Sequence, residues 1–387
     1  MKRFALNFWF SFFIFFYFVF VAQAASVDTY SALKTRYLAG GPIKILLVPG
    51  HDDEFSGASF NGAREADLNL QLARTLAGYL SQDPKIKVTL ERDQNGYNQD
   101  YLNYFNANVS QVMQGVSNQS AITQQAIKTG EVIIQNQVPH ANATTTVVQR
   151  LYVLNNWIDT QGFDLVMHIH FNDYGSRYAD RSGKYSGFSI YVPDSKLLNA
   201  TTSKKFGDAI GQRLSETLYK SNYPAEKAGA DKSGAIPDFY LIAMGAYNSV
   251  AVPRALVEYS YIYEPQLQGN FFAITANVLA RGTASGIFDF LAGKKVANQT
   301  NLDYFWQKDL SVSKKPSASV LALQYALSEL GFYPAKNLTR VSCPFTGIFG
   351  NCTTKALNAF QASRNLSQTG MAGPATRQLL NQIFTDN

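Results

Sequence analysis

The chain has 387 residues, of which 46% are hydrophobic and 16% are charged, so it is long and apolar enough for two or three globular domains. The formal net charge is +6 at pH 7, but the lysines and arginines are scattered, which argues against a nucleic-acid-binding protein. A weak positive charge of this kind is compatible with contact with an anionic surface.

The first 24 residues have the composition of an export signal. Lys2 and Arg3 precede an apolar run from Phe8 to Val21, and Ala22-Gln23-Ala24 offers a small-x-small cleavage site. The run is near the upper length limit for such a signal, so an uncleaved membrane anchor is the alternative. We find no second apolar stretch of spanning length, and we expect the rest of the chain to lie outside the bilayer.

A strand and a helix are predicted on either side of a loop near residue 50. A short polar lead-in, Ser26 to Gly41, precedes them. Ile45 to Val48 form an apolar run closed by Pro49-Gly50, which is typical of a buried strand that ends in a tight turn. Beyond the loop, leucines recur at every fourth position, as they do in an amphipathic helix: Leu68, Leu72, Leu76 and Leu80.

This loop carries a histidine at one end and a glutamate at the other. His51 is the first residue past the turn, and Glu65 lies one turn before the first leucine of the helix. A loop that folds back would bring the two side chains together, and zinc accepts imidazole nitrogen and carboxylate oxygen in one site. The alternative is that His51 merely follows a strand and that Glu65 favours a helix N-terminus.

An Asn/Gln-rich segment follows, from Gln94 to Val148. It shows helical periodicity between Ala121 and Ile134 but contains few large apolar residues. We expect a peripheral helical cap or loop that is more mobile than the rest of the fold.

Two further apolar runs are predicted to be strands, and each carries side chains of chemical interest. Phe163 to Phe171 contains His168 and His170, which leave the same face of the strand because they are two residues apart. Only one of them need bind a metal. The second run, Val250 to Pro265, contains Glu258, a carboxylate that is costly to bury unless it is paired, protonated or close to a metal.

Strands alternate with helices as far as Gly293, and one of these helices is an amphipathic segment from Lys204 to Leu218. This order predicts an α/β fold with a mostly parallel central sheet flanked by helices. The polar stretch from Lys294 to Pro316, with an aromatic cluster at Tyr304 to Trp306, is expected to be a linker.

The last segment is predicted to be a small all-α domain of three short helices joined by glycine turns. In chain order it contains Leu323-Gln324, Leu330-Gly331, Gly347-Ile348-Phe349-Gly350, the run from Thr353 to Gln361, and Thr369-Gly370. Cys343 and Cys352 flank the third of these motifs and are the only cysteines. In an exported chain such a pair is expected to form a disulfide, and no histidine is near enough in sequence to suggest a zinc site there.

The patches around residues 51, 170 and 258, in this order, resemble the zinc-dependent N-acetylmuramoyl-L-alanine amidases. That family has a Gly-His loop, a glutamate before a helix, an Ile-His-x-Asn strand and a late Leu-Val-Glu strand. The resemblance implies that Zn²⁺ is bound by three residues: His51, Glu65 and His170. It also makes Glu258 the catalytic glutamate, and Thr89 and Arg92 resemble the residues that close the strand after the first helix.

The chain departs from the family pattern at several positions. Asp52-Asp53 stands where glycines are usual, and His168 stands where serine is usual. We favour His170 over His168 as the ligand because Asn172 follows it at the family's spacing. Four residues remain candidates for contacts with the ligands or the substrate, with packing or surface capping as the alternative: His168, Asn172, Asp52 and Asp53.

The segment from Gln94 to Val148 has no counterpart in a minimal enzyme of this kind, so we treat it as an insertion. Some relatives carry a helix in a similar place that blocks the zinc until a partner removes it. The insertion is therefore expected either to shield or shape the substrate groove, or to be a passive elaboration, and an activating partner would be of unknown identity.

The succession of glycine-turn motifs near the C-terminus resembles the three-helix type of peptidoglycan-binding domain, with a generic helical bundle as the alternative. The resemblance implies peptidoglycan as the partner and a location in the periplasm, the cell wall or the extracellular space. No nucleic acid partner is expected, and membrane contact is expected only if the signal stays uncleaved. The predicted organisation is a signal peptide at 1–24, a lead-in at 25–40, a catalytic domain at 41–293 with the insertion at 94–148, a linker at 294–316 and a peptidoglycan-binding domain at 317–384.

The resemblance implies a hydrolase that cuts the amide bond between N-acetylmuramic acid and the L-alanine of the stem peptide. Two imidazoles and a carboxylate leave a zinc position open for water, whose pKa zinc lowers to about 7, and Glu258 would act as the general base. Two alternatives remain. A non-catalytic wall-binding protein would not need the intact ligand set, and a zinc peptidase acting on the stem peptide would share every metal residue.

Overall fold

The computed structural model describes residues 29–134, 137–140, 143–174, 177–248, 250–297, 302 and 304–385. The predicted export signal at residues 1–24 lies outside the described residues.

The predicted lead-in is a helix rather than a polar stretch. Residues 29–38 are helical, and the side chains of Leu33 and Tyr37 are buried in the main core. The Tyr37 hydroxyl also donates to Asp83 Oδ2 at 2.8 Å. The expectation was wrong because two apolar side chains one helical turn apart are enough to dock a short helix.

A six-stranded sheet forms the centre of the larger domain, in the order β4-β1-β7-β10-β8-β9. The strands are β1 (Ile43–Pro49), β4 (Ile86–Leu90), β7 (Leu165–Asn172), β8 (Ser189–Pro193), β9 (Ala235–Asp238) and β10 (Arg254–Tyr261). Neighbouring strands are parallel except β10 and β8. This arrangement confirms the predicted mostly parallel sheet. Two small hairpins, β2 (Ser59–Phe60) with β3 (Ala63–Arg64) and β5 (Arg92–Asp93) with β6 (Gly96–Tyr97), extend from its loops.

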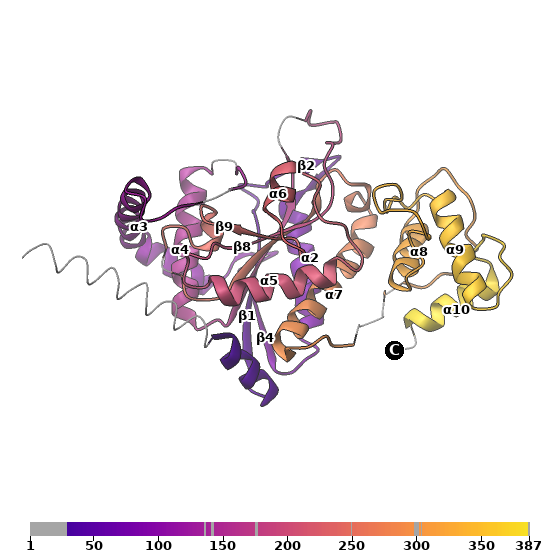
Figure 1. Ribbon diagram of the computed structural model, residues 1–387, viewed down its shortest axis with the longest axis horizontal. Helices are drawn as coiled ribbons and strands as arrows, with labels where there is room; N and C mark the ends of the chain where they lie inside the picture. Colours follow the sequence, from indigo (N-terminus) through magenta and orange to yellow (C-terminus); the bar gives the residue numbers. More distant parts are fainter. Residues whose placement is uncertain are drawn as a thin grey trace, which may run out of the picture.

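Helices cover both faces of this sheet (Figure 1). One face packs against α2 (Glu65–Leu80), α5 (Ala200–Leu214) and α7 (Phe271–Ala292), and the other against α3 (Gln99–Lys128) and α4 (Thr145–Gln161). Three short elements lie in the loops: α6 (Pro224–Gly229), η1 (Ile242–Met244) and η2 (Pro265–Leu267). The chain therefore has the α/β layers that the alternation of strands and helices predicted.

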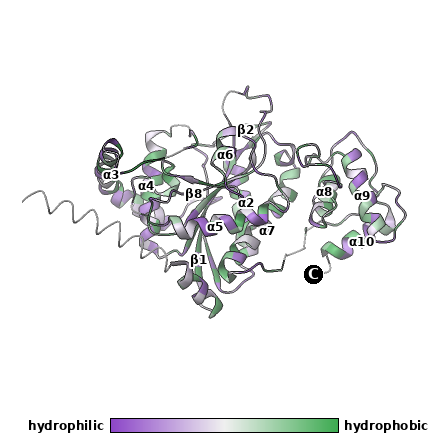
Figure 2. Cartoon of the chain, in the orientation of Figure 1, coloured by the Kyte–Doolittle hydropathy of each residue, from purple (hydrophilic) through white to green (hydrophobic). Residues whose placement is uncertain are grey.

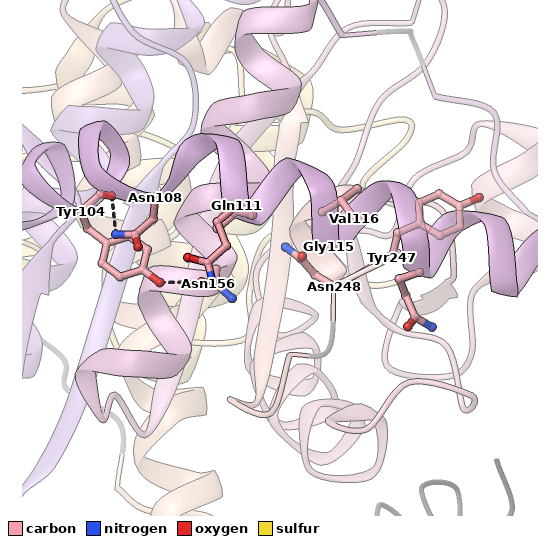
Figure 3. Close-up of a pocket in the computed structure, with 10 residues that line it drawn as sticks. Tyr104, Asn108, Gln111, Gly115, Val116, Asn156, Tyr247 and Asn248 are labelled. Atoms are coloured by element: carbon pink, nitrogen blue, oxygen red, sulfur yellow. Dashed lines mark hydrogen bonds between the residues drawn. The ribbon is translucent and has the colours of Figure 1, made fainter. Parts of the chain in front are cut away.

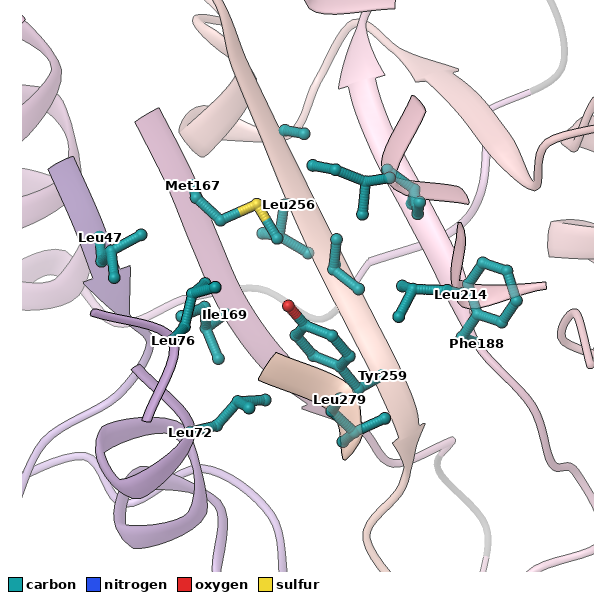
Figure 4. Packing of buried hydrophobic residues seen from close by; sticks show 14 of the residues in the cluster. Leu47, Leu72, Leu76, Met167, Ile169, Phe188, Leu214, Leu256, Tyr259 and Leu279 are labelled. Carbon is teal, nitrogen blue, oxygen red and sulfur yellow. The ribbon is translucent and has the colours of Figure 1, made fainter. Parts of the chain in front are cut away.

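The main hydrophobic core lies between the sheet and α2, α5 and α7. Figure 4 shows side chains of β1, β7 and β10 facing Leu72 and Leu76 of α2 and Leu279 of α7. The four leucines of the predicted stripe are all buried. Figure 2 colours β1 as mainly hydrophobic, as expected of a strand in the core, whereas hydrophilic residues are visible on α5. The fourfold spacing of leucines thus correctly predicted α2 and the face that it buries.

The expectation that no second apolar stretch of spanning length follows the N-terminal run was wrong, because α7 is such a stretch. Among the described residues it is the one helix long and apolar enough to cross a membrane, but 67% of its most apolar window is buried inside the fold. It packs against α2 and α5. Core packing therefore accounts for its apolar composition.

The insertion is more helical and better packed than predicted. Helix α3 begins at Gln99, far before the predicted start at Ala121, because Asn98 caps it by accepting hydrogen bonds from Asp100 N and Tyr101 N. Its apolar side chains pack on α4 and on the sheet, and the buried ones are Tyr101, Val112, Val116 and Ala126. The expectation that few large apolar residues would pack this segment down was wrong, because Tyr101, Tyr104 and Phe105 join the smaller apolar residues in the contact face.

The C-terminal domain consists of three helices, as predicted: α8 (Ala318–Glu329), α9 (Asn351–Ser363) and α10 (Pro374–Thr385). Cys343 and Cys352 form a disulfide. Gln324 fixes the loop between them, because its Oε1 accepts hydrogen bonds from Thr346 N and Gly347 N at 3.1 and 3.0 Å.

Part of the predicted linker belongs to the core of this C-terminal domain. Leu302 and Trp306 are each only 1% exposed and lie in the same cluster as α8, α9 and α10. Trp306 Nε1 donates to Ser319 O at 3.0 Å. The prediction of a linker as far as residue 316 was wrong because polar neighbours concealed two apolar anchors.

Helix α7 also joins the two domains. Val278 on this helix belongs to the C-terminal cluster, Arg281 forms an ion pair with Glu329, and Thr275 Oγ1 lies 3.3 Å from the Tyr325 hydroxyl. The C-terminal domain is therefore docked on the larger domain through side chains.

Candidate metal centre

Three neighbouring strands carry the predicted site residues near their carboxyl ends. β1 ends at Pro49, two residues before His51. Pro49 lies opposite Ile169 of β7, and the next residue of β7, His170, lies opposite Glu258 of β10. Parallel strands end at the same edge of a sheet, so this register gathers side chains that are far apart in sequence.

His51, Glu65 and His170 converge at this edge, and one potential ligand atom from each lies within 4.8 Å of the others. The Glu65 carboxylate stands between the rings, with Oε2 3.2 Å from His51 Nε2 and Oε1 3.0 Å from His170 Nδ1. Backbone amides hold the carboxylate, because Ala58 N donates to Oε2 and Phe171 N donates to Oε1. Two imidazoles and one carboxylate are a donor set typical of catalytic zinc sites.

The protonation states of Glu65 and His170 suit metal binding, whereas a metal at His51 would have to compete with a proton. Burial opposes ionisation of Glu65, but hydrogen bonds from His170 and His51 outweigh it and hold the pKa of this carboxyl far below its usual range. Burial lowers the pKa of His170 in spite of the hydrogen bond to Glu65. Burial acts in the same direction on His51, but the hydrogen bond and charge of Glu65 overcome it, so the pKa of His51 is raised. At pH 7 Glu65 is a carboxylate and His170 is neutral, which are the forms that bind a metal.

Two glycines make room for this convergence. A Cβ atom at Gly50 would overlap the His170 ring, and a Cβ atom at Gly57 would overlap Glu65 Oε2 and the His51 ring. Gly57 also has a φ of +70°, a conformation that favours glycine. A larger residue at either position would push the three side chains apart.

Arg92 ties the loop after β1 to the start of α2. Its buried guanidinium donates to Pro49 O and Gly50 O, each at 3.1 Å, and to Ala66 O at 2.9 Å. Asn69 Nδ2 donates to Gly50 O at 2.8 Å. The arginine that we noted at the end of a strand therefore shapes the loop that carries His51.

Glu258 lies beside His170 on the neighbouring strand and is largely buried. Its Oε2 atom has no hydrogen-bond partner among the described residues. Burial raises the pKa of Glu258 well above its ordinary value, and the negative charges of Glu65 and Glu226 raise it further. A buried carboxyl group with a high proton affinity, next to a potential metal cluster, suits proton transfer.

Glu226 is a buried residue near this site that the sequence analysis missed. It lies on α6, is 1% exposed, and accepts hydrogen bonds from four side chains: Asn172, Ser189, Tyr191 and Tyr261. Asn172, which was a candidate contact of the ligands or substrate, therefore anchors Glu226. A single glutamate in an unpatterned loop gave no signal in the sequence.

Comparison with known protein families shows which family this chain belongs to. Residues 45–270, more than half of the chain, match the family described as N-acetylmuramoyl-L-alanine amidase. The chain belongs to this amidase family. Residues 316–380 match the family described as a peptidoglycan binding domain, so the amidase domain is followed by a wall-binding domain. The predicted peptidoglycan amidase is therefore confirmed.

Solved amidase structures resemble this chain at low sequence identity. The N-acetylmuramoyl-L-alanine amidase from Clostridium difficile 630 is 15% identical with a TM-score of 0.39, over 66% of this chain and 99% of that one. Ami1 from Mycobacterium smegmatis is 14% identical with a TM-score of 0.41, over 66% and 99%. AmiC2 of Nostoc punctiforme is 17% identical with a TM-score of 0.37, over 65% and 98%. No curated protein sequence gives a significant match.

In this amidase His168 stands apart from the three converging side chains. It is 1% exposed, and its Nε2 atom has no hydrogen-bond partner among the described residues. Burial and the nearby charge of Arg254 lower its pKa well below the ordinary value. His168 is therefore a neutral, packed histidine.

The two aspartates that follow His51 point in different directions. The side chain of Asp53 is 95% exposed and pairs with Arg64, so the structure does not bring it into the site. Asp52 turns inward and contacts Tyr97 and Arg150.

The amidase domain also has a polar groove of about 350 Å³ on α3, which shares no residue with the site (Figure 3). Its lining is dominated by carboxamide and tyrosine side chains, among them Asn108, Gln111, Asn156 and Tyr104. It carries no charged side chain, so it lacks the groups that hydrolysis of an amide requires.

Proposed function

We propose that this amidase binds one Zn²⁺ through His51, Glu65 and His170 and uses Glu258 as its general base. The observation that carries the proposal is the convergence of two imidazoles and an ionised carboxylate within 4.8 Å, with Glu258 on the adjacent strand. The bond cleaved is the amide between N-acetylmuramic acid and L-alanine, which is the activity of the family.

The residues fit a zinc ion in their chemistry and in their surroundings. Glycines at 50 and 57 leave space for the three side chains to meet. His51 Nδ1 lies 3.2 Å from Phe55 O, and because a carbonyl only accepts, Nδ1 carries a proton, which leaves Nε2, the atom that faces Glu65, as the one that would bind the metal. Zn²⁺ held by such a set supplies Lewis acidity, which polarises a carbonyl and lowers the pKa of water to about 7.

Glu258 is proposed to move the proton. Its Oε2 atom accepts the proton that the attacking water loses and returns it to the amide nitrogen as the C–N bond breaks. The pKa of this carboxyl is raised in the metal-free site, and the positive charge of a bound Zn²⁺ would lower it, so that the carboxylate could accept the proton and then return it. Glu226, fixed by its four donors, contributes negative charge that strengthens this proton affinity.

We further propose that the enzyme is exported. Peptidoglycan lies outside the cytoplasm, residues 1–24 have the composition of a signal peptide, and a disulfide between Cys343 and Cys352 suits an oxidising compartment. We assign residues 29–293 to the catalytic domain, because Leu33 and Tyr37 pack in its core. The binding domain is assigned from about residue 302, because Leu302 and Trp306 pack with its helices.

Metal analysis of purified variants tests the ligand set. His51→Ala, Glu65→Gln and His170→Ala should each lose zinc, because each removes one of three donors. His168→Ala is the matched control on the same strand and should keep full occupancy. Full occupancy in His170→Ala together with loss in His168→Ala would reverse the assignment.

A separate variant tests the general base. Glu258→Gln should retain the fold and the zinc but lose about 10²- to 10⁴-fold in turnover, because an amide cannot accept the proton. Turnover within a fewfold of the wild type would remove Glu258 from this role.

A further inference from the structure

His51 adopts a backbone conformation that is unusual for a histidine. Its φ is +63°, in the left-handed region that few residues other than glycine occupy. Such a conformation persists only where surrounding contacts enforce it. The residue after it is Asp52, and both oxygens of its carboxylate are engaged in hydrogen bonds.

One oxygen of Asp52 closes the turn on which His51 sits. Oδ1 accepts hydrogen bonds from Glu54 N at 2.9 Å and from Phe55 N at 2.7 Å. The carbonyl of Phe55 in turn lies 3.2 Å from His51 Nδ1. Asp52 therefore holds the amide side of Phe55, and the carbonyl of the same residue sets the ring orientation of His51, with Nε2 toward Glu65.

The other oxygen of Asp52 is held from outside the loop. Oδ2 accepts hydrogen bonds from the Tyr97 hydroxyl and from Arg150 Nη1, the latter at 2.7 Å. Arg150 also donates to Glu54 through Nη2 at 2.6 Å, and its guanidinium lies 5.5 Å from the Phe55 ring centre. Asp52, Glu54 and Phe55 of this short loop thus all contact Arg150.

Tyr97 lies near the start of the insertion, and Arg150 lies just past its end. Tyr97 is in β6, immediately before α3, and Arg150 is in the second turn of α4. The segment between them contains α3, which packs on α4. Any displacement of α3 relative to α4 would therefore act on the two donors that hold Asp52.

We propose that Asp52 is a positioning residue that orients His51 for metal binding, and that Tyr97 and Arg150 couple the insertion to this ligand by holding Asp52. The inference rests on the proposed role of His51 as a zinc ligand. It assigns the insertion a function in shaping the metal site, in place of a purely peripheral one.

Zinc affinity measured by competition with a chelator tests the proposal. Asp52→Asn preserves the size of the side chain but removes the charge that Arg150 pairs with, so it should weaken zinc binding about 10- to 100-fold, as loss of a residue that orients a ligand does. Asp53→Asn is the matched control on the same loop, exposed and outside the network, and should bind zinc as the wild type does. Equal affinities of Asp52→Asn and Asp53→Asn would overturn the proposal.

Arg150 provides a second, independent variant. Arg150→Met should weaken zinc binding to a similar degree, and Arg150→Lys should restore part of the loss. The double variant of Asp52→Asn and Arg150→Met should bind zinc no more weakly than whichever single variant has the lower zinc affinity. Additive losses would contradict a common pathway. Circular dichroism of the metal-free variants should match that of the wild type, which would show that a weaker zinc affinity does not come from loss of the fold.

The same titration separates this inference from the proposed function. If His51→Ala binds zinc as the wild type does, the ligand assignment itself fails. If His51→Ala loses zinc while Asp52→Asn and Arg150→Met bind it normally, the ligand assignment stands and the positioning role fails.

Discussion

Glu91 is predicted to make the stability of the catalytic domain depend on pH. It follows β4 and is 4% exposed, and its backbone is fixed on both sides, because its amide donates to Leu47 O and its carbonyl accepts from Asn98 N. Burial raises its pKa from 4.5 to about 8, and the opposing charge of Arg92 only partly offsets this effect. The folded protein therefore keeps a proton on Glu91 at pH values where the unfolded chain has lost it.

The sign and size of the effect follow from these two pKa values. The folded pKa lies above the unfolded one, so the stabilising contribution is complete below about pH 4.5 and is lost as the pH rises toward 8. Each pKa unit is worth about 1.4 kcal/mol, so the loss between pH 4.5 and pH 7 is roughly 3 kcal/mol. Glu91→Gln keeps a neutral side chain of the same shape at every pH. It should match the wild type near pH 4.5 and exceed it by roughly 3 kcal/mol at pH 7.

Urea unfolding of the wild type and the variant at a series of pH values from 4.5 to 8 measures this difference. Subtracting the two curves removes the titration of every other group. Glu131→Gln, at an exposed glutamate of the insertion, is the control and should show no such trend. A stability difference between Glu91→Gln and the wild type that stays constant across this range would refute the reasoning.

Three further predictions concern packing and loop geometry. Leu72→Ala should destabilise the catalytic domain by about 2 to 5 kcal/mol in urea unfolding, because Leu72 is fully buried between α2 and the sheet; a loss below about 1 kcal/mol would contradict this packing. Gly57→Ala should lower zinc affinity, whereas Gly62→Ala, at a similar positive φ but with open space around it, should not; equal effects would show that backbone strain and not crowding is responsible. Replacing Cys343 and Cys352 with serine should destabilise the C-terminal domain by about 3 kcal/mol, measured by its thermal unfolding, and an unchanged transition would show that the disulfide adds nothing.

The sequence predicted those elements whose apolar pattern is regular. The fourfold leucine spacing of α2 and the apolar runs of β1, β7 and β10 depend on local periodicity alone. Elements held by isolated anchors escaped prediction, as with Leu33 and Tyr37 in the helix at 29–38 and Trp306 in the supposed linker. The start of α3 had a local signal in its cap, Asn98, but its weak apolar content obscured it.

The residues of the site likewise fall into those that local patterns predict and those that depend on contacts distant in sequence. His51 and Glu65 border one loop, so their proximity follows from a strand, a turn and a helix. The placement of His170 beside Glu258 depends on the register between β7 and β10, which no local pattern encodes and which only the family resemblance supplied. Contacts such as those of Glu226 and of Arg150 with Asp52 join residues that are 35 to 98 positions apart, and a single sequence gives no sign of them.

Mass analysis of the fragments released from purified peptidoglycan tests the central claim most directly. The zinc-loaded enzyme should release intact stem peptides that begin with L-alanine and leave glycan strands without peptides, and Glu258→Gln should release almost none. Shortened stem peptides would show instead a zinc peptidase, and binding to peptidoglycan without any release would show a wall-binding protein; either result would contradict the account.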